Sequence, residues 1–262
     1  MHTHIHHSPH TRAEGQPRIS LQLRDPRQER YLHGAAVQNR WYKHTPPPHS
    51  GNIAVSPIAA TAITGFSLTP VDLDGYATST QLTGNASAPG PGALFAKNAA
   101  ALTVAVLDMQ NAYTDAASRA TSDSAKLNLG GGILGGAFGG EDAPLTPGVY
   151  TFASNVNIAD SIYFEGSGGD DANDIFIIQI TGNLAQAAST NVVLRNGAKA
   201  ENIFWQVAGL VLVQVGAHLE GIILTHTLAV FMTGASLHGR VLAQTAVTIQ
   251  MANITEPVLC PM

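Results

Sequence analysis

Residues 202–250 read NIFWQVAGLVLVQVGAHLEGIILTHTLAVFMTGASLHGRVLAQTAVTIQ, and this stretch decides the fold expected for the chain. It is a succession of short apolar runs separated by turns. The strand that begins at Gly221-Ile222 has its equivalent in the strand that begins at Gly239-Arg240, 18 residues later. Repeated short strands without hairpin signals or alternating helices are typical of a solenoid. We therefore expect a parallel β-helix.

Three kinds of strand recur through residues 146–256. The first kind is almost continuously apolar, as in DIFIIQI (174–180), which indicates burial on both sides. The second kind alternates, as in LVLVQ (210–214) and LAVFM (228–232), so every other side chain points inward. The third kind has the charge and imidazole of a solvated face: Glu165, Arg195, His218, Glu220 and His238. Each coil thus contains three strands and three turns.

One long helix is expected over about residues 94–120, where helix formers dominate. Its apolar residues Leu102, Val106, Met109 and Tyr113 recur at three- and four-residue steps, as on one helix face. This face can cover the apolar outer side of the first strand kind. The Gly-rich stretch 130–140 that follows lacks the Lys-Ser/Thr of a phosphate-binding loop, so we interpret it as a flexible connector.

Composition and charge exclude several classes of protein. Of the 262 residues, 45% are hydrophobic and 12% are charged, and the net charge is −5, which argues against intrinsic disorder. The absence of a basic excess argues against nucleic acid as a partner. No apolar run is long enough to span a membrane, so we expect no membrane partner. The single cysteine, Cys260, permits neither an intramolecular disulfide nor a Cys-based zinc site.

The charges divide the chain near residue 50. Residues 1–49 have seven basic and three acidic residues, net +4, whereas residues 50–262 have six basic and fifteen acidic, net −9. Eight of the 11 His also lie before residue 50. We expect residues 1–49 to be a His/Arg/Pro-rich leader, disordered or aberrant, and residues 50–262 to be the folded domain. The opening histidines could bind a transition metal, but a poorly ordered tail explains them as well.

Several longer motifs carry a family resemblance. GNIAVSPIAATAITGFSLT (51–69), AVLDMQNAYTDAASRA (105–120), TGASLHGRVLAQTAV (233–247) and the closing NITEP (253–257) resemble the ice-binding (antifreeze) proteins of diatoms, fungi and polar bacteria. The resemblance covers roughly residues 51–257. It implies a discontinuous right-handed β-helix of triangular section, mainly β, with one long helix packed along one face. It also implies ice as the partner, thermal hysteresis and inhibition of ice recrystallisation.

The resemblance places ice binding on the outward side of the second strand kind. Asn157, Ala185, Leu212, Val230 and Thr248 would form its central row. The full outward set has no charge, which suits an interaction surface. Its fifteen members are Asn155, Asn157, Ala159, Asn183, Ala185, Ala187, Leu210, Leu212, Gln214, Leu228, Val230, Met232, Ala246, Thr248 and Gln250. Gln186 falls at an inward position and would need a polar partner.

Other functions find less support in the residues. Polysaccharide-cleaving β-helices need clustered carboxylates, and here Asp170, Asp171 and Asp174 fall between strands, where a turn explains them better than a Ca²⁺ site. His226 and His238 form no recognisable motif, and we expect them to be solvated. We therefore expect no enzyme, no cofactor and no metal. An extracellular adhesion or carbohydrate-binding β-helix is the alternative to ice binding.

Two departures from the family pattern shape the remaining expectations. The leader occupies the place of the family's first strand, and no signal peptide is visible, although the resemblance implies secretion. In addition, Leu210, Leu212, Leu228, Val230 and Met232 stand where relatives more often have small or polar residues. We expect a monomer, with self-association through this apolar stripe as the other possibility.

Overall fold

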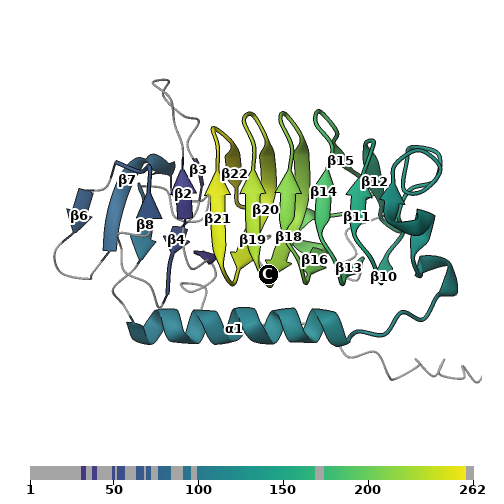
Figure 1. Cartoon of the computed structure of the whole chain (residues 1–262), viewed down its shortest axis with the longest axis horizontal. Coiled ribbons are helices and arrows are strands. Elements are labelled where there is room, and N and C mark those ends of the chain that lie inside the picture. Colours follow the sequence, from purple (N-terminus) through teal and green to yellow (C-terminus); the bar gives the residue numbers. More distant parts are fainter. Residues whose placement is uncertain are drawn as a thin grey trace, which may run out of the picture.

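Parallel strands stack into a solenoid whose coils turn through three faces, with one long helix alongside (Figure 1). The molecule is represented by a computed structural model. It describes residues 31–33, 37–39, 49–50, 52–56, 63–67, 69–71, 76–83, 91–95, 99–168 and 174–257. The expectation of a mainly β, discontinuous parallel β-helix with one packed helix is confirmed.

The first strand kind forms the helix-covered face. Its strands pair in parallel and in register, so that Tyr150, Ile178, Trp205 and Ile223 lie side by side on successive coils. The strands of this part of the sheet are β10 (Gly148–Phe152), β13 (Phe176–Ile180), β16 (Ile203–Val207) and the second halves of β18 (His218–Thr225) and β20 (Ser236–Ala243). Every residue of β13 and β16 is buried, as continuous apolarity predicts.

The second strand kind forms an eight-stranded sheet that we call the open face. In spatial order its strands are β9 (Ile133–Leu134), β11 (Val156–Ile158), β14 (Leu184–Gln186), β17 (Val211–Val213), β19 (Leu228–Phe231), β21 (Ala246–Ile249), β2 (Val37–Asn39) and β5 (Ile63–Thr64). The described pairings are all parallel, which keeps equivalent residues of successive coils aligned.

The third strand kind closes each coil. It comprises β12 (Ile162–Glu165), β15 (Val192–Arg195), the first halves of β18 and β20, and β22 (Asn253–Thr255). In β18 and β20 the chain passes from this third face to the helix-covered face within one strand of eight residues. The described part of the chain therefore has the three faces expected from the three strand kinds.

Large apolar side chains from all three faces fill the interior. Trp205, Phe152, Phe164, Phe176 and Phe231 are all completely buried. Phe164 meets Phe176 and Trp205 edge-on, with ring centroids 5.0 and 5.8 Å apart, the geometry that aromatic quadrupoles favour. The one polar atom of the Trp205 ring is also satisfied, because Nε1 donates to the Glu220 carbonyl at 2.9 Å. Such packing gives the coils a rigid interior.

The long helix α1 (Ala99–Ser118) runs along the solenoid against the helix-covered face. It starts five residues later than predicted, because Pro91–Phe95 form strand β8 and pair with neighbouring strands instead. Its buried residues are Leu102, Ala105, Met109, Ala112 and Ala116, mostly small residues that allow close approach to the sheet. Among the described residues, no helix is long and apolar enough to cross a membrane.

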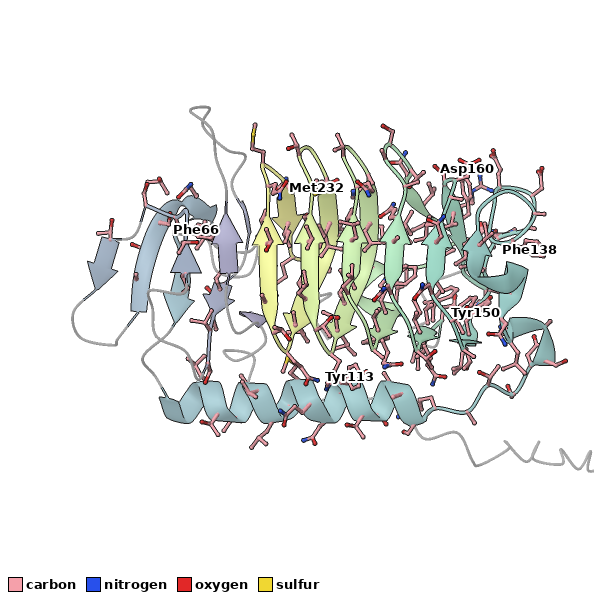
Figure 2. All side chains as sticks on the ribbon, viewed as in Figure 1. Phe66, Tyr113, Phe138, Tyr150, Asp160 and Met232 are labelled. Atoms are coloured by element: carbon pink, nitrogen blue, oxygen red, sulfur yellow. The ribbon has the colours of Figure 1, made fainter. Side chains whose placement is uncertain are left out.

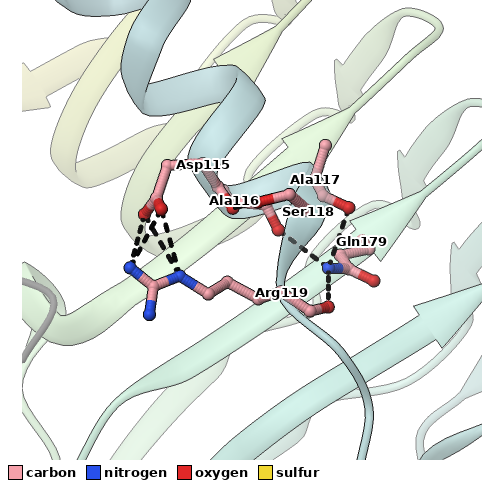
Figure 3. Close-up of polar contacts among 6 residues, drawn as sticks. All are labelled: Asp115, Ala116, Ala117, Ser118, Arg119 and Gln179. Carbon is pink, nitrogen blue, oxygen red and sulfur yellow. Dashed lines mark hydrogen bonds and ion pairs between the residues drawn. The ribbon is translucent and has the colours of Figure 1, made fainter. Parts of the chain in front are cut away.

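A glutamine from the sheet caps the end of α1 (Figure 3). The Nε2 of Gln179 on β13 donates to the carbonyls of Ala116 at 2.8 Å, Ala117 at 3.3 Å and Arg119 at 2.6 Å. These are carbonyls that the helix itself cannot satisfy. The Oε1 of Gln179 accepts a bond from the Thr151 hydroxyl at 2.7 Å. One side chain thus fixes the helix terminus to the solenoid.

The solenoid is discontinuous in sequence. Beyond β20 the stack continues with the strands from the N-terminal part of the chain, which are β1 (Tyr31–His33), β3 (His49–Ser50), β4 (Asn52–Ala54), β6 (Thr69–Val71), β7 (Tyr76–Thr83) and β8. From there α1 returns the chain along the stack to β9 and β10, and the later coils build back until β20 meets β1 (Figure 1). Strands β1 and β2, and the first residue of β3, fall within residues 1–49, which the charge pattern assigns to a leader outside the folded domain.

The Gly-rich stretch is part of the fold and differs from the flexible connector that we expected. It begins in the short helix η3 (Leu129–Gly132) and continues as β9, which pairs with β11. Gly130 and Gly131 have φ of 58° and 62°, a left-handed conformation that glycine adopts without strain. Leu134 is buried, so the stretch contributes to the core at this end of the solenoid.

Candidate functional site

The open face alternates between buried and accessible side chains as predicted. Its inward residues are completely or almost completely buried, for example Val211 and Val213 on β17 and Ala229 and Phe231 on β19. All fifteen outward residues predicted from the sequence are exposed or half-buried. The alternation is therefore confirmed, and the fifteen residues lie on one accessible surface.

The middle outward residues form a straight row across the sheet. Asn157 pairs with Ala185, which pairs with Leu212; the row continues through Val230 to Thr248. Neighbouring parallel strands lie about 4.8 Å apart, so these side chains repeat at a constant spacing. A row of this kind needs parallel strands in strict register, and the described ladders provide them.

The structure extends this central row beyond the five predicted positions. Ile133 on β9 pairs with Asn157 at one end, and its side chain is 59% exposed. At the other end Gln38 on β2 pairs with Thr248, and Thr64 on β5 pairs with Gln38. The eight-residue central row contains no charge, and its seven strand spacings cover about 34 Å. Sequence reasoning missed all three added positions because they lie in a Gly-rich stretch, in the leader and in a two-residue strand.

Two residues of the predicted set have a structural task. The Oδ1 of Asn155 accepts a hydrogen bond from the Asn183 backbone N–H at 2.8 Å. The Oδ1 of Asn183 in turn accepts one from the Leu210 N–H at 2.9 Å. These amides tie successive coils together at the corner between the helix-covered and open faces. Their chemistry toward solvent is therefore limited to the amide nitrogens.

The same corner explains two glycines. A Cβ at Gly182 would lie 2.3 Å from the Asn155 Oδ1, and one at Gly209 would lie 2.1 Å from the Asn183 Oδ1. Both distances are far below van der Waals contact, so a larger residue would displace the amide. A signal for this ladder exists in the sequence, since Gly182-Asn183 precedes β14 and Ala208-Gly209 stands at the same corner one coil later. This sequence signal can be interpreted only when the pairing of the coils is known.

An apolar block occupies the middle of the open face. We give this name to Leu210, Leu212, Leu228, Val230 and Met232, all half-buried and outward-facing (Figure 2 labels Met232). Polar or small outward residues flank the block on both sides, with Asn157 and Ala185 toward β9 and Thr248 toward β5. The open face is thus uncharged throughout but not uniformly polar.

Gln186 is the polar residue that the sequence placed inward, and the structure buries it. Its Nε2 donates to the Thr190 carbonyl at 3.1 Å and to the His218 carbonyl at 3.0 Å. The expected need for a partner is met on the donor side. The side chain thereby links the open face to the third face from inside.

The third face has a small network of imidazoles around one carboxylate. Glu220 accepts from His218 Nε2 at 3.0 Å and from His238 Nδ1 at 2.9 Å, and the other His218 ring nitrogen lies 2.7 Å from the Ser236 hydroxyl. The expectation that His238 is simply solvated is therefore wrong, because its ring is hydrogen-bonded to Glu220. Burial raises the pKa of Glu220, but hydrogen bonds from the two histidines outweigh it, so this pKa is lowered. The hydrogen bond to Glu220 raises the pKa of His238, against the effect of burial.

The structure gives Asp174 a local role. Its carboxylate accepts from the Ser167 N–H at 2.6 Å and from the Ser167 hydroxyl at 2.8 Å, as expected for a residue that stabilises a turn. Asp170 and Asp171 lie outside the described residues, as do the histidines of the opening leader. Within the described ranges, no group of three or more His, Cys, Asp or Glu side chains could hold a metal ion.

Comparison with known proteins agrees with this geometry. Residues 48–255 match the sequence profile of the family described as ice-binding-like. The chain belongs to the ice-binding-like family. Among its relatives, an ice-binding protein of Flammulina populicola is 40% identical over 209 residues, 80% of this chain and 78% of the relative. One of Flavobacterium frigoris is also 40% identical, over 79% of this chain and 67% of the relative.

Solved structures of this family share the fold. An ice-binding protein from an Arctic yeast superposes with a TM-score of 0.74 at 35% sequence identity, covering 88% of this chain and 92% of that protein. A Shewanella frigidimarina ice-binding protein domain gives a TM-score of 0.69 at 23% identity, which supports the fold alone. The resemblance stated from the motifs is thus confirmed for the family and for the fold.

Proposed function

We propose that this member of the ice-binding-like family binds ice through its open face. The observation that supports the proposal most directly is the central row, eight uncharged positions in register across one sheet. The relatives named above are ice-binding proteins. The family's antifreeze activity, including thermal hysteresis and inhibition of ice recrystallisation, is proposed for this chain as well.

The physical mechanism follows from flatness, rigidity and low charge. Charged groups hold water strongly in their own hydration geometry, and the open face has none among its outward residues. Aligned small polar and apolar groups can instead order water in a lattice that merges with a crystal plane. Because the coils are already rigid, little conformational entropy is lost on adsorption. Adsorbed molecules force ice to grow as curved fronts between them, which lowers the freezing temperature.

The apolar block fits the same mechanism. Leucine, valine and methionine side chains cannot hydrogen-bond to water, so water above them is organised by its own neighbours. Thr248 and Asn157 beside the block offer hydrogen-bonding groups at the same spacing. We propose that both parts of the face contact ice. The apolar block contacts it through complementary shape, and the polar residues beside the block contact it through water molecules that they hydrogen-bond.

The site is tested by bulky substitutions on and off the face. Thr248→Tyr and Ala185→Tyr should each lower thermal hysteresis several-fold, because a protruding ring keeps the ice surface away from the sheet. Thr255→Tyr on β22 is the matched control on the third face and should leave hysteresis unchanged. Circular dichroism should show that all three variants are folded. Unchanged hysteresis in both open-face variants would refute the assignment of this face.

We also propose that the protein acts outside the cell as a monomer. Extracellular ice is the phase that a secreted ice-binding protein can reach, and one open face is sufficient for adsorption. Sedimentation analysis at several concentrations tests the oligomeric state. A dimer that dissociates in a Leu212→Asn, Val230→Asn double variant would instead assign the apolar block to self-association.

A further inference from the structure

We propose that Asn155 and Asn183 anchor water along one edge of the open face, through side-chain amides that the fold holds in a single orientation. They belong to the outward row beside the helix-covered face, which we call the first row; it continues through Leu210 and Leu228 to Ala246. The inference rests on the proposed function and gives one edge of that face a defined hydrogen-bonding direction.

The orientation of each amide is set by a backbone N–H of the next coil. The Oδ1 of Asn155 accepts from the Asn183 N–H at 2.8 Å, and the Oδ1 of Asn183 accepts from the Leu210 N–H at 2.9 Å. A backbone N–H can only donate, so the amide oxygen must face it and the amide nitrogen must lie on the other side. The hydrogen-bond network thus decides which way each amide points.

The amide nitrogens are available to water. Asn155 is exposed and Asn183 is half-buried, and within the described ranges no hydrogen-bond partner is found for the Nδ2 atom of either side chain. Because the two residues are aligned on adjacent coils, the two NH₂ groups repeat at about one strand spacing, roughly 4.8 Å. The edge therefore presents two uncharged donors in fixed directions and at a fixed spacing.

The opposite edge of the open face has amides of a different kind. Gln214 and Gln250 lie there in one outward row with Met232 between them, and their side chains have no hydrogen-bond partner among the residues that the structure describes. A glutamine that the protein does not hold loses rotamer freedom when it binds, whereas the two asparagines have already lost it on folding. The same chemical group should therefore contribute more to adsorption in the first row.

Leucine substitutions test this difference, because leucine is close to asparagine in size, has no charge and already occupies two positions of the first row. Asn155→Leu and Asn183→Leu should each lower thermal hysteresis several-fold. Ala246→Leu adds the same side chain to the row without removing an amide, and Gln214→Leu removes an amide that the protein does not hold. Both controls should keep hysteresis close to that of the unmodified protein. Circular dichroism at the assay temperature should show that all four variants are folded.

A second pair of variants covers the case in which leucine prevents folding. Asn155→Asp keeps the oxygen that accepts the Asn183 N–H but loses the NH₂ donor, and Gln214→Glu introduces the same charge at the other edge. Asn155→Asp should lower hysteresis several-fold more than Gln214→Glu does.

The outcomes separate this inference from the proposed function. Unchanged hysteresis in the folded asparagine variants, or an equal loss in the matched glutamine variant, would overturn the role of the oriented amides. If Thr248→Tyr and Ala185→Tyr lower hysteresis and the asparagine variants do not, the open face binds ice without anchored water at this edge. If none of these variants lowers it, both the face and the role of the amides are refuted.

Discussion

Replacing Gln179 by alanine should destabilise the protein without affecting its ice face. The substitution removes the donor that serves the carbonyls of Ala116 and Arg119 at 2.8 and 2.6 Å, and the acceptor of the Thr151 hydroxyl. Gln179 is 7% exposed, so water replaces these bonds poorly. At about 1 kcal/mol for each good hydrogen bond, the loss is roughly 2–3 kcal/mol of unfolding free energy.

Thermal unfolding followed by calorimetry or circular dichroism measures this loss. For a domain of this size, 1 kcal/mol shifts the melting temperature by about 2–4 °C, so a loss of about 2–3 kcal/mol in Gln179→Ala should lower it by roughly 4–12 °C. Gln110→Ala on the exposed side of α1 is the control and should change the melting temperature little. Near 0 °C both variants should keep full thermal hysteresis, because the open face lies on another side of the solenoid.

The result that would refute this reasoning is a melting temperature of Gln179→Ala within about 1 °C of the unmodified protein. It would mean that α1 is held by apolar packing alone. Lost hysteresis in a folded Gln179→Ala variant would be equally damaging, because it would show that α1 and the open face are coupled.

Two further predictions concern the corner ladder and the third face. Asn183→Ala leaves the Leu210 N–H without its acceptor and should cost about 1–2 kcal/mol in urea unfolding, whereas Asn183→Asp, which keeps the acceptor oxygen, should recover part of it. Because the pKa of His238 is raised, its protonated form stabilises the fold below the ordinary pKa of 6.5, and this stabilisation is lost as pH rises through the raised pKa. Because the pKa of Glu220 is lowered, its ionised form stabilises the fold above the ordinary pKa of 4.5, and this stabilisation is lost as pH falls through the lowered pKa. Glu220→Gln should therefore lower the free energy of unfolding most between pH 4.5 and pH 6.5. The loss should be less than about 1 kcal/mol, because His238 is partly exposed. Equal losses in urea titrations at mildly acidic and at alkaline pH would contradict this prediction.

Much of the fold could be predicted because parallel coils repeat their burial pattern. Val211 and Val213 alternate with Leu212 in the sequence, and the structure gives them the predicted inward and outward positions. The continuous apolarity of Phe176–Ile180 likewise predicted a strand covered on both sides. These are local signals, set by the two-residue period of a strand.

What could not be predicted depends on pairs of residues far apart in the sequence. Gly182 beside Asn183 is a signal for the hydrogen bond between the Asn183 amide and the Leu210 N–H, but it has meaning only once the pairing of the coils is known. The start of α1 at Ala99 was missed because tertiary pairing of Pro91–Phe95 overrides helix propensity there. Gln38 was missed for the same kind of reason, since a three-residue strand has meaning only beside β21 and β5.

The discontinuity of the solenoid also affects how the protein comes to be made. His33 pairs with Leu242, so the last joint of the structure connects segments separated by about four-fifths of the chain. Contacts of such long range slow folding, because loop-closure entropy must be overcome before they contribute. A ribosome would release almost the whole polypeptide before this joint could close. During synthesis the N-terminal strands therefore have unpaired edges until the C-terminal strands have been made. Low temperature weakens the hydrophobic driving force and would prolong this interval.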